Sequence, residues 1–218
     1  MSEKTNLPAG SELLSRKDHH RARVDRIFDG LKDGTFNEEQ VRKMLTGMLT
    51  IADLKGSQDN VMKMPNRSEF DKKVQKLVDE GVEFGFIIAD IDHFKDFNDK
   101  YGHGVGDIVL ALVGNSLKES LREGDFIARW GGEEIGILGF FKNEKELKEI
   151  SERLRIKIAG IDHFTVSHEV IPGITVSLGA GIFKSGKFED FFQKVDGKLY
   201  EAKKAGRNQV RIIESENV

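Results

Sequence analysis

The stretch "DFIARWGGEEIGILGF", residues 125–140, decides the fold class of this 218-residue chain. Two short runs of strand-forming residues flank the turn Gly131-Gly132-Glu133-Glu134, and this pattern predicts a β-hairpin. A hairpin puts antiparallel strands into the sheet, so a purely parallel, doubly wound fold is excluded. The sequence therefore favours an α+β (mixed α/β) domain.

The chain around the hairpin alternates between strand and helix patterns. "FGFIIAD", residues 84–90, is a dense apolar run typical of a buried strand, and its carboxyl end delivers Asp90. A glycine-rich loop and a helical pattern follow it. Beyond the hairpin we expect a helix, the strand "ITVSLGAGIF", another helix and a last short strand around "QVRII". Together these elements predict a central, mainly antiparallel five-stranded sheet flanked by helices.

Residues 1–58 predict a separate helical segment. Within it, residues 41–55 place apolar side chains on alternating three- and four-residue steps. This pattern fits an amphipathic helix packed on its own domain, and it also fits a dimer-forming signalling stalk. Pro65 and Asn66 stop one helix, and Ser68 can cap the next. We therefore divide the chain into residues 1–58 and 59–218.

Composition excludes several classes of function. The chain has 34 basic and 37 acidic side chains and a net charge of −3, so nothing attracts it generally to nucleic acid or anionic lipid. The absence of cysteine excludes disulfides, zinc-thiolate sites and thiol catalysis. The first residues lack a signal-peptide pattern, and no apolar run approaches the ~18 residues of a membrane span. We expect a cytoplasmic protein.

Carboxylates in two places suggest a metal site. Asp90 and Asp92 follow the first strand, and we expect only one of them to share a site with the hairpin turn. If that strand runs beside the hairpin, Asp90 converges with Glu133 and Glu134 as oxygen ligands suited to Mg²⁺. Since Mg²⁺ combines few carboxylates with substrate phosphates, the group points to a nucleoside triphosphate. Taken alone, the turn is better explained as a solvated, charged loop.

Polar residues elsewhere fit such a ligand. Lys95 supplies charge for phosphate, and Asn98 and Asp107 can pair with a base edge. An aspartate acceptor suits guanine, which carries N–H donors on its Watson–Crick edge. Lys203 and Arg207 are four residues apart, and on one helix face they would clamp terminal phosphates. A solvated basic helix end is the alternative interpretation.

Five separated motifs carry a resemblance to a known family. Residues 59–213 resemble the GGDEF family of diguanylate cyclases, whose fold is similar to nucleotide cyclases and the polymerase palm. The signature turn reads GGEEI here, and its fifth position, Ile135, is phenylalanine in the family. The motifs, in chain order, are "DNVMKMPNR", "DIDHFKDFNDKYGHGVGD", "REGDFIARWGGEEI", "ITVSLGAGI" and "LYEAKKAGRNQV".

The resemblance implies a role for each matching residue. It implies that Glu133 and Glu134 are catalytic carboxylates. The implied metal ligands are Asp90, the Ile91 carbonyl, Glu133 and Glu134; Gly131 and Gly132 let the turn approach the nucleotide; Asn98 and Asp107 hold guanine; His93, Phe94, Lys95, Lys203 and Arg207 hold phosphates; and Arg122, Asp125 and Arg153 form a product-binding inhibitory site.

The resemblance also implies a reaction. Two GTP molecules on the facing subunits of a homodimer would condense to cyclic di-GMP and pyrophosphate, with Mg²⁺ as cofactor and Mn²⁺ as a substitute. Product would inhibit through the RxxD motif of Arg122 and Asp125. The alternative is a catalytically silent module that acts as a cyclic di-GMP receptor. Neither function involves nucleic acid or a membrane.

The sequence departs from the family pattern at two places, and it contains one stretch that only partly matches an unrelated motif. Ile135 lies in a strand, so we expect it to face the core and to affect packing rather than chemistry. "DNVMKMPNR" lacks the usual threonine and glycine of its turn, which puts its coupling to the N-terminal segment in question. "GIFKSGKF" fits a P-loop except that Phe188 replaces the required Ser or Thr.

Overall fold

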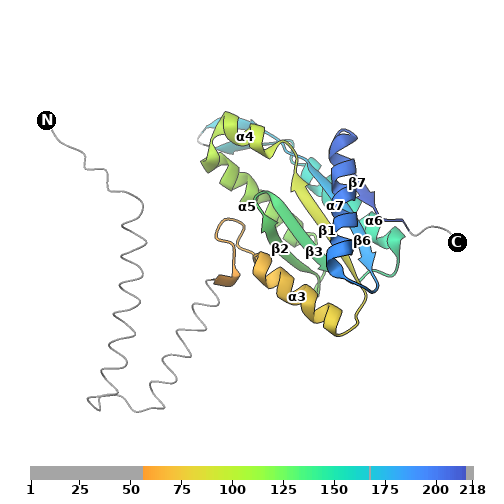
Figure 1. The fold of residues 1–218 in the computed structure, drawn as a ribbon. Coiled ribbons are helices and arrows are strands. Elements are labelled where there is room, and N and C mark those ends of the chain that lie inside the picture. The colour runs from red at the N-terminus through yellow and green to blue at the C-terminus, as the bar shows by residue number, and fades with distance from the viewer. Residues whose placement is uncertain (1–55, 167, 215–218) are drawn as a thin grey trace, which may run out of the picture. The chain divides into compact units, whose positions relative to one another are not determined.

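A five-stranded sheet lies between two layers of helices in the computed structural model, which describes residues 56–166 and 168–214 (Figure 1). The strand order is β2-β3-β1-β6-β7; β6 and β7 are parallel and the other neighbours are antiparallel. The predicted mainly antiparallel five-stranded sheet is confirmed. The elements are α3 (Arg67–Asp79), β1 (Phe84–Ile91), α4 (Phe94–Tyr101), α5 (His103–Glu119), β2 (Phe126–Gly131), β3 (Glu134–Gly139), α6 (Glu144–Ala159), β4 (His163–Val166), β5 (Glu169–Pro172), β6 (Val176–Phe183), α7 (Phe188–Lys204) and β7 (Val210–Ile212).

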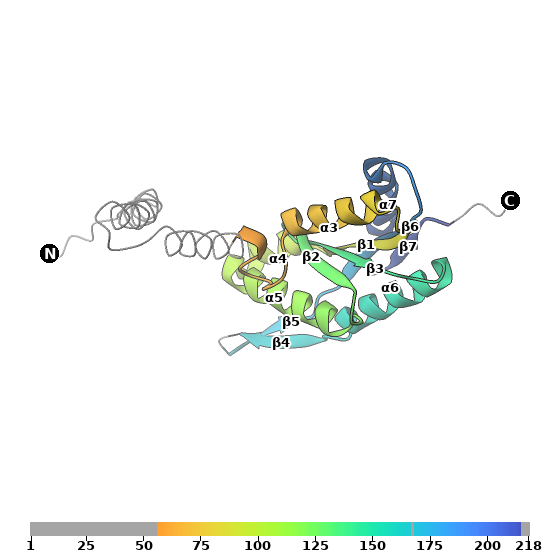
Figure 2. The same cartoon turned by 90° about the horizontal axis from the view of Figure 1, so that it is seen from below.

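The central strand β1 is buried on both faces, as its continuous apolar run predicts. Its even-numbered residues, such as Phe86 and Ile88, pack against α3 and α7 in an aromatic-rich core. Its odd-numbered residues, such as Ile87 and Ala89, pack in the other core with α5 and α6. Figure 2 shows α3 and α7 on one side of the sheet and α5 and α6 on the other.

Helix α7 approaches β6 most closely at Gly179. A Cβ at this position would overlap the carbonyl oxygen of Val195 and lie 2.6 Å from the backbone nitrogen of Leu199. Neither backbone atom can turn away as a flexible side chain could. The missing side chain therefore sets how closely the last helix, which carries Lys203, lies on the sheet.

We expect Gly179→Ala to lower the free energy of unfolding by about 3 kcal/mol, because the new methyl group forces the helix off the sheet. The matched control is Gly197→Ala in α7, the helix that packs on Gly179. An added Cβ at Gly197 meets nothing within 4 Å. That change should stabilise the protein by roughly 0.5–1 kcal/mol through helix propensity. Urea unfolding followed by circular dichroism measures both, and equal effects would show that the close approach is unimportant.

Two local predictions were wrong, and one pair of strands was missed. The stretch after Asp90 is not simply a glycine-rich loop, because residues 94–101 form α4. The cap of α3 is Asn66 rather than Ser68, and the Asn66 side chain accepts a hydrogen bond from the Glu69 N–H. The antiparallel β4–β5 pair was not anticipated, since four residues per strand are too few to establish a period.

The N-terminal prediction is not tested. The expected helices and the apolar seam of residues 41–55 lie outside the described residues, and the boundary at residues 58 and 59 stays a prediction. The elements given above belong to a compact unit that begins at Ser57. Among the described helices, none combines the length and the apolar character needed to cross a membrane.

Candidate active site

Asp90 and Glu134 lie side by side at one end of the sheet. They are register partners on the antiparallel strands β1 and β3, so their side chains share a face, the one that α7 covers. From α7, the Lys203 ammonium reaches the Asp90 carboxylate at 2.7 Å. Glu133 lies in the turn directly before β3. The predicted convergence of β1 with the hairpin turn is therefore present in the structure.

Burial and mutual repulsion make this group of carboxylates costly to ionise. Burial, and to a lesser extent the charges of Glu133 and Glu134, raise the pKa of Asp90 to about 6 against the opposing effect of the Lys203 ammonium. Burial also raises the pKa of Glu134, again opposed by Lys203. Three carboxylates thus face one lysine, which leaves an excess of negative charge.

That excess suits a divalent cation. Among the described residues, no cluster of three or more His, Cys, Asp or Glu side chains is already arranged around a metal position. Even so, the donors are the carboxylate oxygens that Mg²⁺ prefers, and Lys203 supplies positive charge at the place where a cation would act. The residues present therefore fit a divalent metal whose remaining ligands come from elsewhere.

Asp92 has a different, structural role. Its carboxylate accepts hydrogen bonds from the Thr175 and Ser177 hydroxyls, both at 2.6 Å, and from the Asn208 N–H at 3.0 Å. These contacts tie the end of β1 to β6 and to the loop before β7. Strand β1 ends at Ile91, so only Asp90 is left beside the hairpin turn, as expected.

The prediction that Lys203 and Arg207 share a helix face was wrong. Helix α7 ends at Lys204, and Gly206 and Arg207 have φ values of 109° and 63°, which the helix cannot contain. The Arg207 N–H closes the turn on the carbonyl of Ala202. The two basic residues remain neighbours, one on the helix and one in the turn that follows it.

The residues expected to bind the base meet where α4 turns into α5. Gly106 packs directly on the Asn98 side chain, since a Cβ there would overlap Asn98 Oδ1, and Asp107 follows it. Asn98 Oδ1 is buried and has no hydrogen-bond partner within the described part of the chain. His93, Phe94 and Lys95 begin α4, with His93 in a left-handed conformation at φ 57°.

Arg129 holds the hairpin turn to the segment before α3. Its Nε donates to the Gly132 carbonyl at 2.8 Å, and its Nη1 donates to Asp59 at 2.7 Å. Burial alone would raise the pKa of Asp59, but the Met62 N–H and the Arg129 guanidinium outweigh burial and hold the pKa below its usual range. The "DNVM" turn is thus closed without the threonine and glycine that the family has there.

We expect Asp59→Ala to lower the free energy of unfolding by about 1–3 kcal/mol, because it leaves the half-buried Arg129 and two N–H groups without their acceptor. Asp71→Ala is the control, since Asp71 is exposed and lies 4.0 Å from its partner Arg67. That change should cost less than about 0.5 kcal/mol. Denaturant titration of both variants measures the difference, and a similar small loss in both would contradict the role given to Asp59.

The departure at Ile135 concerns packing, as predicted. Ile135 is fully buried, pairs with Ala89 of β1 and belongs to the core beneath α5 and α6. Its side chain therefore lies on the opposite face of β3 from Glu134. The isoleucine that breaks the signature contributes to the core and leaves the carboxylate face intact.

The RxxD residues form a closed turn between α5 and β2. The Arg122 N–H donates to the Asp125 carboxylate at 3.0 Å, and the Asp125 N–H donates back to the Arg122 carbonyl. The Arg122 guanidinium is ion-paired with Glu146 of α6 at 2.9 Å. Arg153 of α6 donates to the carbonyl of Ser120, which caps α5. The structure thus brings Arg122, Asp125 and Arg153 to one junction, and it adds Glu146, which the sequence did not suggest.

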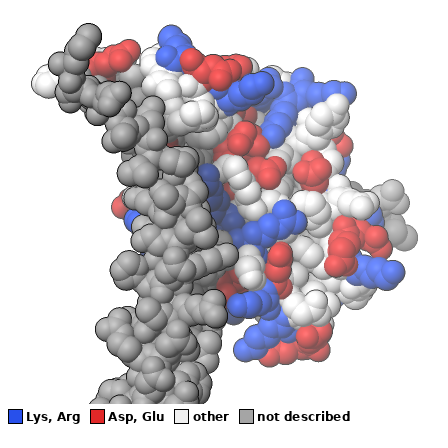
Figure 3. Space-filling view, turned by 60° about the vertical axis from the view of Figure 1, so that its left-hand side comes forward, with Lys and Arg blue, Asp and Glu red and all other residues white. Residues whose placement is uncertain are grey.

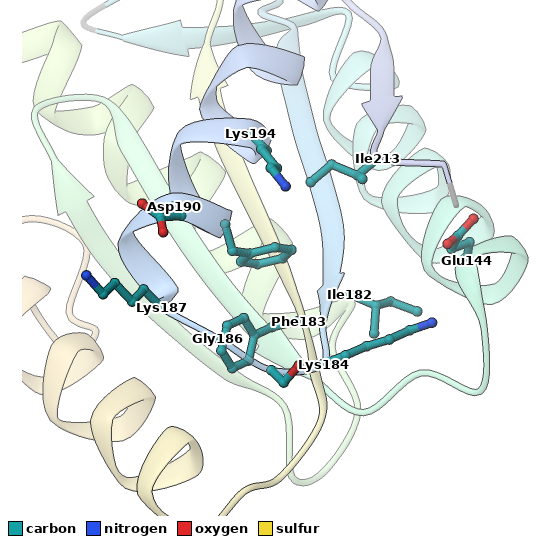
Figure 4. Close-up of a pocket in the computed structure, with 11 residues that line it drawn as sticks. Glu144, Ile182, Phe183, Lys184, Gly186, Lys187, Asp190, Lys194 and Ile213 are labelled. Carbon is teal, nitrogen blue, oxygen red and sulfur yellow. The ribbon is translucent and has the colours of Figure 1, made fainter. Parts of the chain in front are cut away.

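The P-loop-like stretch borders a pocket of about 410 Å³ at the N-terminal end of α7. Figure 4 shows the side chains of Lys194 and Ile213 pointing toward each other across it. Phe188, which stands where a P-loop needs a hydroxyl, packs against the rings of Phe84 and Phe86. By strand register this pocket lies at the opposite end of β1 from Asp90, so it is separate from the carboxylates.

Charges of both signs are interspersed on the face of the molecule shown in Figure 3. This mixture agrees with the near balance of 34 basic and 37 acidic residues. Local charge, such as that of Lys203 and the three carboxylates, therefore decides what the candidate site attracts.

A mainly antiparallel sheet with carboxylates on its central strand and in the adjacent hairpin turn is the architecture of GGDEF domains. The chain belongs to this family: the family model described as "Diguanylate cyclase, GGDEF domain" matches residues 57–209.

Curated relatives carry the same family name. The chain is 32% identical over 211 residues to Diguanylate cyclase DgcP of Pseudomonas aeruginosa. The aligned region covers 94% of this chain and 31% of DgcP. It is 34% identical over 151 residues to Probable diguanylate cyclase DgcT of Escherichia coli. This aligned region covers 67% of this chain and 33% of DgcT. The chain therefore spans about a third of the length of these relatives.

Solved structures agree with the fold. The GGDEF domain of DgcB from Caulobacter crescentus, in complex with c-di-GMP, matches with a TM-score of 0.67 and 29% identity over 73% of this chain and 94% of that one. A longer DgcB structure, with coiled coil and GGDEF domain, matches with a TM-score of 0.75 at 24% identity over 84% of this chain and all of that one.

Proposed function

We propose that this chain is a diguanylate cyclase, which condenses two GTP molecules to cyclic di-GMP with release of two pyrophosphates. The observation that carries the proposal is the pairing of Asp90 with Glu134 beside the Glu133 turn, within reach of Lys203. This group fits a triphosphate with its divalent cation. The relatives named above support the same reaction for this domain.

The chain's residues bind and orient GTP. Asp107 accepts N–H donors of guanine, and Asn98 contributes its amide beside it. Lys203 and Arg207 neutralise the phosphates, for which Lys203 leaves its ion pair with Asp90. Gly132, at φ 36°, lets the turn backbone approach the nucleotide without a side chain in the way.

Asp90, the Ile91 carbonyl, Glu133 and Glu134 would hold Mg²⁺, with Mn²⁺ as a substitute. A cation held by these residues would supply activation of the attacking 3′-hydroxyl and stabilisation of the charge on the leaving pyrophosphate. Glu133 is the residue we propose to receive the hydroxyl proton. One domain holds one GTP, so the reaction needs a homodimer in which two such sites face each other.

Product inhibition belongs to the same proposal. Cyclic di-GMP would bind Arg122 and Asp125, together with Arg153 from α6. The closed turn of Arg122 and Asp125 and the nearby Arg153 guanidinium support this role, because arginines suit a phosphodiester and guanine edges. Binding there would slow turnover as product accumulates.

The test is to incubate the purified full chain with Mg²⁺ and either GTP or ATP, and to identify the products by mass. Cyclic di-GMP formed from GTP, with nothing formed from ATP, supports the cyclase. Nucleotide extracted from the protein as purified adds a second readout. Cyclic di-GMP bound tightly, with no turnover of GTP, would overturn the enzyme and support the receptor.

A further inference from the structure

The Arg122 guanidinium is already occupied by an acid of this chain. Its Nη1 donates to Glu146 Oε1 at 2.9 Å, and the two residues are 24 positions apart in the sequence. Half of the Arg122 side chain is exposed, whereas the Glu146 side chain is only 19% exposed. The Glu146 side chain is thus the more buried of the two partners.

Glu146 is held in this position from the start of α6. Its Oε2 accepts the Lys142 N–H at 2.7 Å, and its own N–H donates to the Asn143 side chain at 3.0 Å. The Asn143 side chain thus caps the helix, and the Glu146 carboxylate accepts the N–H of the residue before the cap, an arrangement similar to a capping box. The hydrogen bond from Lys142 and the Arg122 guanidinium hold the pKa of Glu146 below its usual range, so it is ionised at neutral pH.

Asp125 and Arg153 bind backbone groups at this junction, so neither competes with Glu146 for the Arg122 guanidinium. The Asp125 carboxylate accepts the backbone N–H of Arg122. Arg153 donates to the neutral carbonyl of Ser120. Of the two arginines expected to bind product, Arg122 is therefore the one that is ion-paired within the described part of the chain.

We propose that Glu146 is an internal competitor for Arg122 that weakens the binding of a phosphodiester ligand and so raises the product concentration needed for inhibition. This inference rests on the proposed product site. A ligand phosphate must replace the Glu146 carboxylate at the guanidinium. The binding free energy therefore contains only the difference between the new ion pair with phosphate and the lost ion pair with Glu146. Without Glu146 no ion pair is lost, and the new one contributes in full.

Glu146→Gln tests the proposal with little change of shape. Glutamine can still accept the Lys142 N–H and is a normal residue at this capping position, but it carries no charge. Since partly exposed ion pairs contribute modestly, we expect cyclic di-GMP to bind about three to five times more tightly. Glu123→Gln is the matched control, because it removes the same charge from the residue next to Arg122, and among the described residues the ion-pair partner of the Arg122 guanidinium is Glu146.

Isothermal titration of the full chain with cyclic di-GMP measures affinity, and the concentration that halves the initial rate with GTP gives a second readout. Both should shift for Glu146→Gln and stay within twofold for Glu123→Gln. In an Arg122→Ala background, Glu146→Gln should have no further effect, because the two residues act as a pair. Thermal unfolding checks that each variant is folded.

The outcomes separate the inference from the proposed function. Unchanged affinity in Glu146→Gln, with binding still lost in Arg122→Ala, would overturn the competitor and leave the product site standing. Tighter binding that persists in the Arg122→Ala background would also overturn it. Absence of Arg122-dependent binding in every variant would overturn the product site, and the competitor with it, while GTP turnover tests the cyclase separately.

Discussion

Replacing Glu133 by glutamine should abolish cyclic di-GMP synthesis and leave the domain folded. Glu133 lies in the turn next to the paired Asp90 and Glu134, where its charge acts on both neighbours. Loss of a preorganised electrostatic group typically costs ~10²-fold or more in rate, and here the same carboxylate is also the proposed proton acceptor. Initial rates of product formation with GTP and Mg²⁺ measure the loss.

Two controls make this result specific. Glu123→Gln, at an exposed position of the turn that carries the RxxD residues, should keep the wild-type rate. The thermal midpoint of Glu133→Gln should stay near that of the wild type, because no hydrogen bond of the Glu133 side chain supports the fold among the described residues. A folded Glu133→Gln protein that retains a tenth of the activity would refute the assigned role.

Replacing Asp90 by asparagine should have two opposite effects: activity is lost, and the metal-free protein becomes more stable at neutral pH. The folded pKa of Asp90 is about 6, against an ordinary value of 3.8. The folded state therefore binds this proton more strongly than the unfolded state. Ionising Asp90 costs folding free energy, and this cost grows as the pH rises from about 4 to 6 and is complete above pH 6.

Two pKa units correspond to roughly 3 kcal/mol, so we expect Asp90→Asn to be about 1–3 kcal/mol more stable than the wild type at pH 7.5. The advantage should become small near pH 4, because the folded carboxyl is protonated there and the unfolded carboxyl, with its ordinary pKa of 3.8, is partly protonated. Urea unfolding with a chelator present, at both pH values, measures the difference between variant and wild type. Added Mg²⁺ should stabilise the wild type more than the variant.

Asp92→Asn is the matched control, since it makes the same chemical change two residues away. Its carboxylate accepts three hydrogen bonds, so the amide should lose contacts and destabilise the protein. The two variants should thus differ in sign at pH 7.5. Destabilisation of both would show that the carboxylate of Asp90 stabilises the fold, against the prediction.

The sheet could be predicted because its signals are local. An eight-residue apolar run identifies β1, and the hairpin sequence fixes the antiparallel pairing of β2 with β3. Period-2 alternation then puts Ile135 in the core and Glu134 on the other face. Helix α4 and the β4–β5 pair could not be predicted. Helix α4 has eight residues and begins after His93 at a positive φ, which tertiary contacts rather than helix propensity must stabilise.

The site was predictable only where it follows a motif. Asp90, Glu133 and Glu134 stand in recognisable stretches, but their electrostatic partners do not. Arg129 and Asp59 are 70 residues apart, and no periodicity links them. The supposed helix face of Lys203 and Arg207 failed because four-residue spacing says nothing about where a helix ends, and Gly206 ends this one.

Arg129 also limits which residues evolution can place before the signature turn. One planar guanidinium donates through Nε to the Gly132 backbone and through Nη1 to Asp59, so two distant parts of the chain depend on the fork of a single side chain. Lysine would conserve the charge, yet its single nitrogen at the end of a flexible stem cannot reproduce that pair of directions. An arginine-to-lysine exchange at this position is thus conservative in charge and disruptive in geometry, and it would disconnect the hairpin turn from the segment before α3.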